Sequence, residues 1–531
     1  MNTAHYDYII IGAGSSGCVT ASRLSEDPKC RVLLIEAGGK DSNPWIHIPL
    51  GFAKSLFNPN LNWRYQTQPE PFLHNRVIEI GAGKVLGGSS SINGMVYIRG
   101  QHADYDHWES LGNTGWSWKD VKPFFLKSEK QERGASSWHG DTGPLHVSNT
   151  RMKNALCDAF VASAAHCGIP VNEDFNGAQQ EGAGYFQFTT KNGFRHSSAA
   201  SFLRIAKRRA NLTIVTAAYV DRVGLLNHRA HQVFYIKDGQ SVAAIADNAI
   251  VLCAGALGSP AILMRSGIGD ATKLEKAGVS VRHELKGVGE NLQDHLQIKM
   301  IFKSSVKGTL NDLYPSFTSK LGILKDYALH RKGWLSNAGA QAGAFVKSAA
   351  DCKEPDIQFH AAPFSALRPQ QGLDKFPGFT FSSCQLRPAS RGSLTIQSAQ
   401  PTIPPVVQFN YLSEKIDRDV MVRGLEIARQ VAATGPLKTV LQEEMFASKE
   451  LADASPLELI KRFGSTVYHP AGSCKMGIDG MSVVDPMLKV YGVEGLYVAD
   501  NSIMPTLVSG NTNAPAIMLG ERVSEFIKAA Q

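Results

Sequence analysis

The chain has few cysteines, and none of them are spaced for metal binding or thiol exchange. Its eight cysteines in 531 residues form no C-x-x-C pair, so zinc-ribbon and thioredoxin-like proteins lack support and we predict no metal site. Scattered thiols without a disulfide framework are typical of a reducing cytosol. We therefore expect a cytoplasmic protein.

Long hydrophobic runs and long basic tracts are also missing. The most apolar stretch, AIVLCAGALGSPAILM (249–264), is broken by Gly, Ser and Pro. This pattern predicts a strand, a turn and a helix beginning near Pro260, and not a membrane span. The N-terminus lacks the basic and apolar regions of a signal peptide. The longest basic cluster is KRR (207–209) and the net charge is +8, so we predict no nucleic-acid partner.

Apolar residues are plentiful enough for a large core. They make up 43% of the chain, and charged residues make up 19%. These proportions are typical of a globular protein, and the length leaves room for more than one domain.

The first recognisable motif is a glycine-rich turn. YDYIIIGAGSSGCVTASRLS (6–25) begins as an apolar strand, becomes G-x-G-x-x-G at Gly12, Gly14 and Gly17, and continues as a helix. Gly12 allows the tight bend, Gly14 allows a pyrophosphate to approach, and Gly17 allows close helix–strand packing. The N–H groups that begin the helix, with Ser15 and Ser16, favour an anion there.

A carboxylate follows at the expected distance. The apolar run RVLLIEAG (31–38) ends at Glu36, nineteen residues after Gly17, where it could accept hydrogen bonds from an adenosine ribose. A connecting turn with a surface glutamate is the simpler alternative. The motif by itself does not separate NAD from FAD.

A second loop narrows the choice of cofactor. GKVLGGSSSINGMVYIRG (83–100) combines glycines, three serines and an asparagine. It offers clustered donors with no bulky side chain, which suits a phosphate or the polar edge of a flavin. Taken alone, it could be a flexible loop.

Four further stretches occur with this loop: GALGSPAILMRSGIG (255–269), GVGENLQDHL (287–296), HPAGSCKMG (469–477) and LYVADNSIMPTLVSGNTNAPAIM (496–518). Together, the five stretches resemble the signatures of the glucose–methanol–choline (GMC) oxidoreductases, which are FAD enzymes. The resemblance runs over nearly the whole chain, in the family's order. It looks closest to bacterial FAD-dependent alcohol and L-sorbose dehydrogenases.

The resemblance implies an α/β fold, with a Rossmann-like FAD-binding domain of the GMC/PHBH type and a second α+β substrate domain whose sheet covers the flavin. We expect the FAD-binding domain to be discontinuous, over 1–155, 200–300 and 460–531. The substrate-binding domain would then comprise 156–199 and 301–459. The alternating pattern of DIQFHAAP (356–363) predicts one strand of its sheet.

The family match also implies cofactor contacts outside the first motif. Besides Gly12, Gly14, Ser15, Ser16, Gly17 and Glu36, the predicted FAD contacts are Val85, Ser90, Asn93, Gly94, Met95, Val96, Val220, Tyr468, Asp500, Asn511 and Thr512. Each of these residues could instead serve local structure alone.

His469 is the predicted catalytic base. A neutral imidazole suits removal of a hydroxyl proton near physiological pH, and Pro470 biases His469 away from helical geometry. The family's His–Asn pair implies Asn513 as its partner, donating to the substrate oxygen. Asn513 could also be a helix N-cap. We interpret His295 and His360 as structural or pocket-lining.

Two departures from the family narrow the prediction. Ile92 stands where some members carry a histidine that binds FAD covalently, so we expect non-covalent FAD. Gln341, in SNAGAQAGAF (336–345), appears where choline-oxidising members carry a glutamate, which argues against choline. Gln341 and Phe345 are the predicted pocket residues.

The predicted function is oxidation of a primary alcohol, polyol or sugar such as L-sorbose, with hydride transfer to the flavin and electrons passed to a quinone or another acceptor. A quinone would favour peripheral contact with the inner membrane, although no anchor is visible. Alternatives are an oxygen-using alcohol oxidase, a choline dehydrogenase, a hydroxynitrile lyase and a non-catalytic dinucleotide-binding scaffold. The sequence gives no prediction of oligomeric state.

Overall fold

Two seven-stranded sheets dominate the computed structural model, which describes residues 4–367, 372–446, 451 and 453–530. The first sheet contains β1 (Ala4–Ile11), β2 (Val32–Ile35), β10 (Leu212–Val215), β11 (Ala218–Leu226), β12 (Arg229–Lys237), β13 (Gln240–Leu252) and β24 (Leu496–Val498). Its order is β10-β2-β1-β13-β12-β11, with β24 also paired to β13. Strands from widely separated parts of the chain therefore share one sheet.

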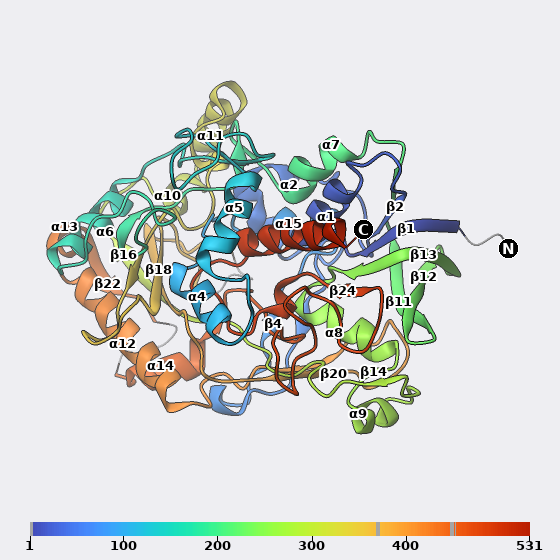
Figure 1. Ribbon diagram of the computed structural model, residues 1–531. Helices are drawn as coiled ribbons and strands as arrows, with labels where there is room; N and C mark the ends of the chain where they lie inside the picture. The colour runs from blue at the N-terminus through green and yellow to red at the C-terminus, as the bar shows by residue number, and fades with distance from the viewer. Residues whose placement is uncertain (1–3, 368–371, 447–450, 452, 531) are drawn as a thin grey trace.

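The parallel part of this sheet explains its apolar sequences. β1 pairs in parallel with β2 and β13, and β10 and β24 extend the parallel region on its two sides. All four residues of β2 are buried, as expected for a strand covered on both faces. Helices α1 (Ser15–Leu24) and α15 (Asn513–Ala529) pack together beside this sheet (Figure 1).

The second sheet is antiparallel. It contains β7 (Gly182–Tyr185), β16 (Leu296–Ser304), β17 (Ala342–Val346), β18 (Ile357–Ala362), β19 (Gly378–Gln385), β22 (Leu441–Glu444) and β23 (Ser465–Thr466), in the order β22-β16-β19-β18-β17-β7 with β23 on β16. Helices α6 (Ala155–His166) and α12 (Lys415–Ala432) pack against it, on the side away from β1 and β2 (Figure 1).

The predicted fold class is confirmed, with a Rossmann-like sheet and a second sheet in one chain. The strand predicted in DIQFHAAP is β18. The domain ranges stay a prediction. Two strands of the second sheet reach beyond the ranges predicted for it, because β16 begins at Leu296 and β23 lies at Ser465–Thr466.

The helix predicted to begin near Pro260 begins earlier. Helix α8 spans Gly255–Arg265, with Pro260 inside it. Proline has no N–H to donate to the carbonyl four residues before it. The hydroxyl of Ser473 donates to that carbonyl, Ala256 O, at 2.5 Å, which satisfies the acceptor and allows the helix to continue through the proline.

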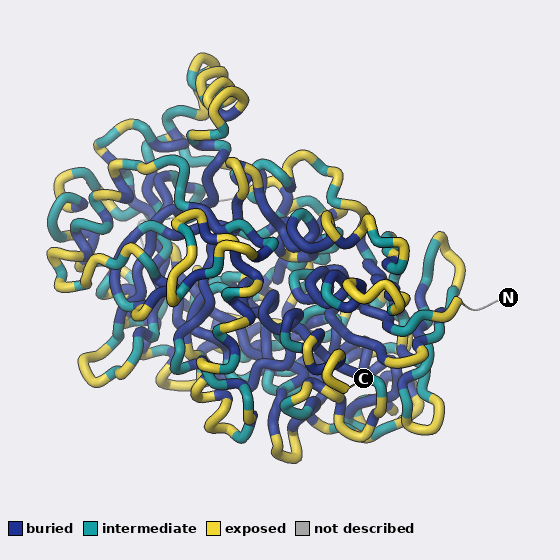
Figure 2. The backbone as a smooth tube through the Cα atoms, turned by 45° about the horizontal axis from the view of Figure 1, so that its top comes forward, coloured by how far each residue is buried: buried dark blue, intermediate teal, exposed yellow. Residues whose placement is uncertain are grey.

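Buried backbone fills the interior of the molecule, whereas one largely exposed helix projects from the body (Figure 2). That helix is α11 (Phe317–His330), of whose residues only Tyr327 is buried. Among the helices that the structure describes, none combines the length and the apolarity needed to cross a bilayer.

Candidate active site

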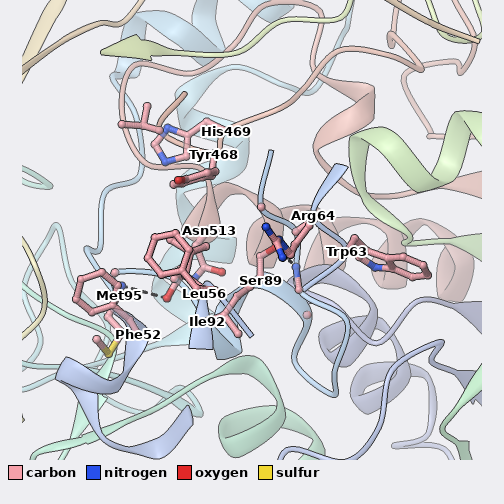
Figure 3. A pocket seen from close by; sticks show the side chains of 18 of the residues that line it. Phe52, Leu56, Trp63, Arg64, Ser89, Ile92, Met95, Tyr468, His469 and Asn513 are labelled. Carbon is pink, nitrogen blue, oxygen red and sulfur yellow. Dashed lines mark hydrogen bonds between the residues drawn. The ribbon is translucent and has the colours of Figure 1, made fainter. Parts of the chain in front are cut away.

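A cavity of about 1270 Å³ extends from the glycine-rich turn after β1 to His469. Residues of both sheets line it, together with the segment 45–65. Figure 3 shows Tyr468 beside His469 with Asn513 below them, Phe52 to the lower left and Trp63 away on the right. The cavity is therefore shared between the two halves of the fold.

Three helices begin at this cavity. Ser15, Gly255 and Asn513 are the first residues of α1, α8 and α15, and all three line the cavity. The N-cap residues Gly14, Ala254 and Thr512 make no capping hydrogen bond through their own side chains, but the first N–H of α8, Gly255 N, donates to Asp500 Oδ2 at 2.9 Å. The positive dipole ends of the three helices, and the uncapped N–H groups of α1 and α15, suit the phosphates and other electron-rich groups of a dinucleotide.

Glycines keep the backbone close at the first turn. Gly12 has φ +97°, and a Cβ there would lie 2.5 Å from Cys253 O. A Cβ on Gly17 would lie 1.9 Å from Gly12 O, so this glycine allows close helix–strand packing. A Cβ on Gly94 would meet no atom within 4 Å, and this residue lines the cavity.

Glu36 is held at the end of β2 by two backbone N–H groups. Ala13 N donates to Oε2 at 2.9 Å and Gly38 N donates to Oε1 at 2.8 Å. Burial raises the pKa of Glu36 to about 7, and the two N–H groups oppose this rise. The carboxyl group lines the cavity, so a hydroxyl-bearing ligand could share its oxygens.

Most of the predicted contact residues line the cavity. They are Gly12, Gly14, Ser15, Ser16, Glu36, Asn93, Gly94, Met95, Val96, Val220, Tyr468, His469, Asp500, Asn511, Thr512 and Asn513. Gly17, Val85 and Ser90 are not among the lining residues. Val85 packs in a small apolar cluster. Ser90 Oγ donates to Gly87 O and accepts from Ser198 N, so its hydroxyl braces the loop.

Gln341 and Phe345 do not line the cavity, which corrects the prediction for both. Gln341 is buried, and its Oε1 lies 3.9 Å from the thiol of Cys157 on α6. Phe345 packs against Phe175. Both lie on or beside β17, and the sequence could not tell which side chains of this strand face the cavity. The argument against choline that rested on Gln341 therefore fails.

Asp294 positions the turn that carries His469. Its Oδ1 accepts from His469 N at 2.8 Å, and its Oδ2 accepts from the hydroxyls of Thr466 and Tyr411. Tyr468 adopts φ +66°, a left-handed conformation that is unusual for a bulky residue and often marks a functional site. The turn is therefore held by a buried carboxylate and not by Pro470 alone.

His295 contacts the predicted base directly. Its Nδ1 lies 3.0 Å from His469 Nδ1, and its Nε2 lies 2.9 Å from Leu386 O. A carbonyl only accepts, so His295 Nε2 donates to it, and neutral His295 then accepts at Nδ1. His469 must therefore carry its proton on Nδ1. This assignment leaves His469 Nε2 unprotonated and able to accept a proton.

Asn511, and not Asn513, lies beside that nitrogen. Asn511 Nδ2 is 3.4 Å from His469 Nε2, and Asn511 Oδ1 accepts from Gln358 Nε2 at 3.2 Å. Asn513 Oδ1 accepts from the hydroxyl of Ser15 at 2.7 Å. Asn513 is the first residue of α15 and Thr512 is its N-cap. The amide beside His469 Nε2 is therefore that of Asn511, whereas Asn513 lines the same cavity, and its predicted donation to the substrate oxygen stays a prediction.

The imidazoles around the site are held neutral. Burial, with His295 and His360 nearby, lowers the pKa of His469 well below its usual range. Burial likewise lowers the pKa of His295 to about 4, and the pKa of His360 to about 4 with additional repulsion from His295 and Lys299. A neutral His469 is the form that can act as a base.

Several lining residues were not anticipated from the sequence. Lys299, Gln297, Ser382 and Thr380 line the cavity from β16 and β19, and His360, interpreted as structural or pocket-lining, lines it from β18. A lysine inside the apolar run LQIKMIF (296–302) was the one available signal, since strands seldom bury a lone charge.

The chain is similar to known proteins over most of its length. Models of the GMC oxidoreductase family match residues 6–297 and 388–520. An alcohol dehydrogenase (acceptor) of Pseudomonas putida is 41% identical over 526 residues, covering 98% of this chain and 95% of its own. An oxygen-dependent choline dehydrogenase of Paraburkholderia phytofirmans is 40% identical over 535 residues, covering 99% and 95%.

A solved structure shares the whole fold. The crystal structure of pyridoxine 4-oxidase from Mesorbium loti superposes with a TM-score of 0.88 at 29% identity, over 98% of each chain. The two family matches together span well over half of the sequence. The chain belongs to the GMC oxidoreductase family.

Proposed function

We propose that this enzyme oxidises an alcohol to the carbonyl with FAD, using Nε2 of His469 as the general base and Asn511 as the donor to the substrate oxygen. The observation that carries the proposal is the hydrogen-bonded series from Leu386 O through His295 and His469 to Asn511. It presents an unprotonated imidazole nitrogen and an amide N–H₂ together at one end of the cavity.

The residues present fit FAD, the cofactor of the GMC family. The N-termini of α1, α8 and α15 suit its phosphates and polar ring edge, and Glu36 suits the ribose. Ile92 lines the cavity at the position of covalent attachment, and an alkyl side chain offers no nucleophile. We therefore propose that FAD is held without a covalent bond. When bound, FAD supplies the acceptor for the hydride that the carbinol carbon loses.

The protein's part in the reaction is to bind the alcohol and to move one proton. The substrate hydroxyl gives its proton to His469 Nε2. The second N–H of Asn511 can donate to the oxygen as negative charge grows there. Gln358 fixes the orientation of the Asn511 amide by donating to its Oδ1. The products at this stage are the carbonyl compound, a protonated His469 and a reduced cofactor.

The proposed substrates are primary alcohols, polyols and sugars, including L-sorbose, with a quinone or another carrier as electron acceptor. The name of the Pseudomonas relative, an alcohol dehydrogenase (acceptor), supports this class. Choline is the substrate named for other relatives. The described carboxyl groups that line the cavity, Glu36, Glu79 and Asp500, all have partners already. No free carboxylate among them would attract a quaternary ammonium.

The direct test is anaerobic reduction of the bound flavin. Wild-type enzyme and His469→Ala would be mixed with primary alcohols, polyols and ketoses, and the loss of flavin absorbance followed. Reoxidation by a soluble quinone or by oxygen then identifies the acceptor. We expect bleaching by at least one of these alcohols in the wild type and much slower bleaching in the variant. If no alcohol reduces the flavin, the proposed function is wrong.

A further inference from the structure

One lysine lies in the cavity wall of the antiparallel sheet. Lys299 is in the middle of β16, and it lines the cavity together with Gln297 and Ile301, two residues to either side. This is the alternation expected of side chains on one face of a strand. The side chain is open to the cavity, although protein encloses it closely enough that burial lowers the pKa of its ammonium group.

The other described cations of the cavity wall all have partners. Lys54 lies 3.6 Å from the ring centre of Trp45, and Lys320 lies 4.5 Å from that of Tyr314. Two arginines also have partners: Arg64 pairs with Glu79 at 2.8 Å, and Arg265 Nε donates to Asp221 O at 2.7 Å. Within the described parts of the chain, the side chain of Lys299 donates no hydrogen bond and has no carboxylate oxygen within 4.0 Å of its ammonium group.

The position of Lys299 places it on the wall that carries the histidine cluster. Lys299 pairs across the sheet with Ser382, and Ser382 pairs with His360 on the next strand. Adjacent strands lie about 4.8 Å apart, so the backbones of Lys299 and His360 are about 10 Å apart. Residues paired directly across neighbouring strands project from the same face of a sheet, so Lys299 and His360 both face the cavity.

From these contacts we infer that Lys299 forms a subsite for an anionic group on the substrate, so that the enzyme prefers an alcohol carrying a carboxylate or phosphate at the end remote from the reacting hydroxyl. The inference rests on the proposed function. The Lys299 side chain is exposed to the cavity and has no partner among the described residues, so an anionic group of a bound substrate can make charge-assisted hydrogen bonds with its ammonium group. The same charge would repel choline.

The cofactor's phosphates are a poor alternative partner. The helix N-termini that suit them belong to α1, α8 and α15, beside the parallel sheet. Lys299 is on the other sheet, near His360. Its loss should therefore leave FAD binding unchanged, which provides a measurement separate from turnover.

The experiment compares matched substrates in anaerobic flavin reduction. The probes are 6-hydroxyhexanoate, its neutral amide 6-hydroxyhexanamide, and choline. We expect the wild type to favour the carboxylate over the amide in kcat/KM by about ten- to hundredfold, the discrimination that one charge-assisted hydrogen bond supports. Lys299→Met should abolish that preference while keeping activity on the amide. Choline should be the poorest of the three.

A matched control lies on the same strand. Lys303 is also on β16, but it is close to Glu443, at 3.9 Å, and does not line the cavity. Lys303→Met should keep the wild-type preference. Binding of hexanoate, which cannot be oxidised here, would be followed by perturbation of the flavin spectrum and should weaken in Lys299→Met alone.

Three outcomes would overturn the inference. The first is an equal kcat/KM for the carboxylate and the amide in the wild type. The second is a preference for the carboxylate that persists in Lys299→Met. The third is loss of FAD from Lys299→Met while hexanoate binding per bound flavin stays unchanged. Each of these leaves the proposed function standing if neutral alcohols still bleach the flavin. Failure of every alcohol to do so would refute the proposed function, and this inference with it.

Discussion

His469 and His295 face each other through their Nδ1 atoms at 3.0 Å, with their ring planes at 82°. Two neutral imidazoles at this distance share a single proton, and the Leu386 carbonyl on the far side of His295 decides which ring carries it. The proton resides on His469, so the nitrogen toward Asn511 is the free one. A main-chain carbonyl thereby sets the tautomer of the proposed base.

Changing His295 tests this assignment. His295→Phe removes the acceptor and should slow flavin reduction by about tenfold, since a neutral hydrogen bond contributes roughly 1–1.5 kcal/mol. His295→Asn places a carbonyl oxygen near the position of Nδ1 and should recover most of the rate. Stopped-flow reduction at equal FAD content would measure both. Equal rates of flavin reduction in His295→Phe and His295→Asn would argue against a role of His295 in setting the tautomer of His469.

Removing the base itself should have the largest effect. His469→Ala should bind FAD and fold, but reduce its flavin about 10²–10⁴-fold more slowly, which corresponds to roughly 3–5 kcal/mol of barrier. Raising the pH should recover part of the loss, because the solvent can then accept the hydroxyl proton. Anaerobic stopped-flow measurements follow both effects. A rate within a few-fold of the wild type would place the base elsewhere.

The two asparagines should behave differently. Asn511→Ala should slow flavin reduction by about 10–100-fold through loss of a donor to the developing alkoxide. Asn513→Ala removes the acceptor of the Ser15 hydroxyl and should chiefly weaken FAD retention. The measurements are the reduction rate per bound flavin and the dissociation constant of FAD. The reverse pattern would restore Asn513 as the partner of His469.

The pH dependence should show a base that stays neutral in mild acid. Because the pKa of His469 is lowered, its unprotonated form persists below the ordinary value of 6.5. The kcat/KM for flavin reduction should therefore be level from neutral pH to below 6.5 and fall only at lower pH. His469→Ala should lack this fall. A fall in kcat/KM centred at or above pH 6.5 would contradict the lowered pKa of His469.

FAD should be released on denaturation. Ile92 at the attachment position predicts that acid or heat precipitation leaves the yellow colour in the supernatant. The absorbance and mass of the released compound identify it as intact FAD. Yellow colour that stays in the washed precipitate would show a covalent bond formed by another residue.

The sequence by itself determined the local features. The spacing of the glycines and of Glu36 predicted the dinucleotide-binding turn. Local backbone geometry within one βαβ unit sets the position of each of these residues. The apolar runs predicted the buried strands for a similar reason. The family signatures also predicted His469, since the chemistry of a base depends first on residue type.

Only the tertiary structure decided which distant groups meet. The contact of Asn511 with His469 and that of Asn513 with Ser15 depend on how the chain packs, and Gln341 is excluded by the direction in which one side chain beside β17 points. The contact of His295 with His469 joins residues 174 positions apart, and the unpaired charge of Lys299 is visible only when its neighbours on β18 and β19 are known. Such relations arise from packing between segments, and no local pattern in a single sequence encodes them.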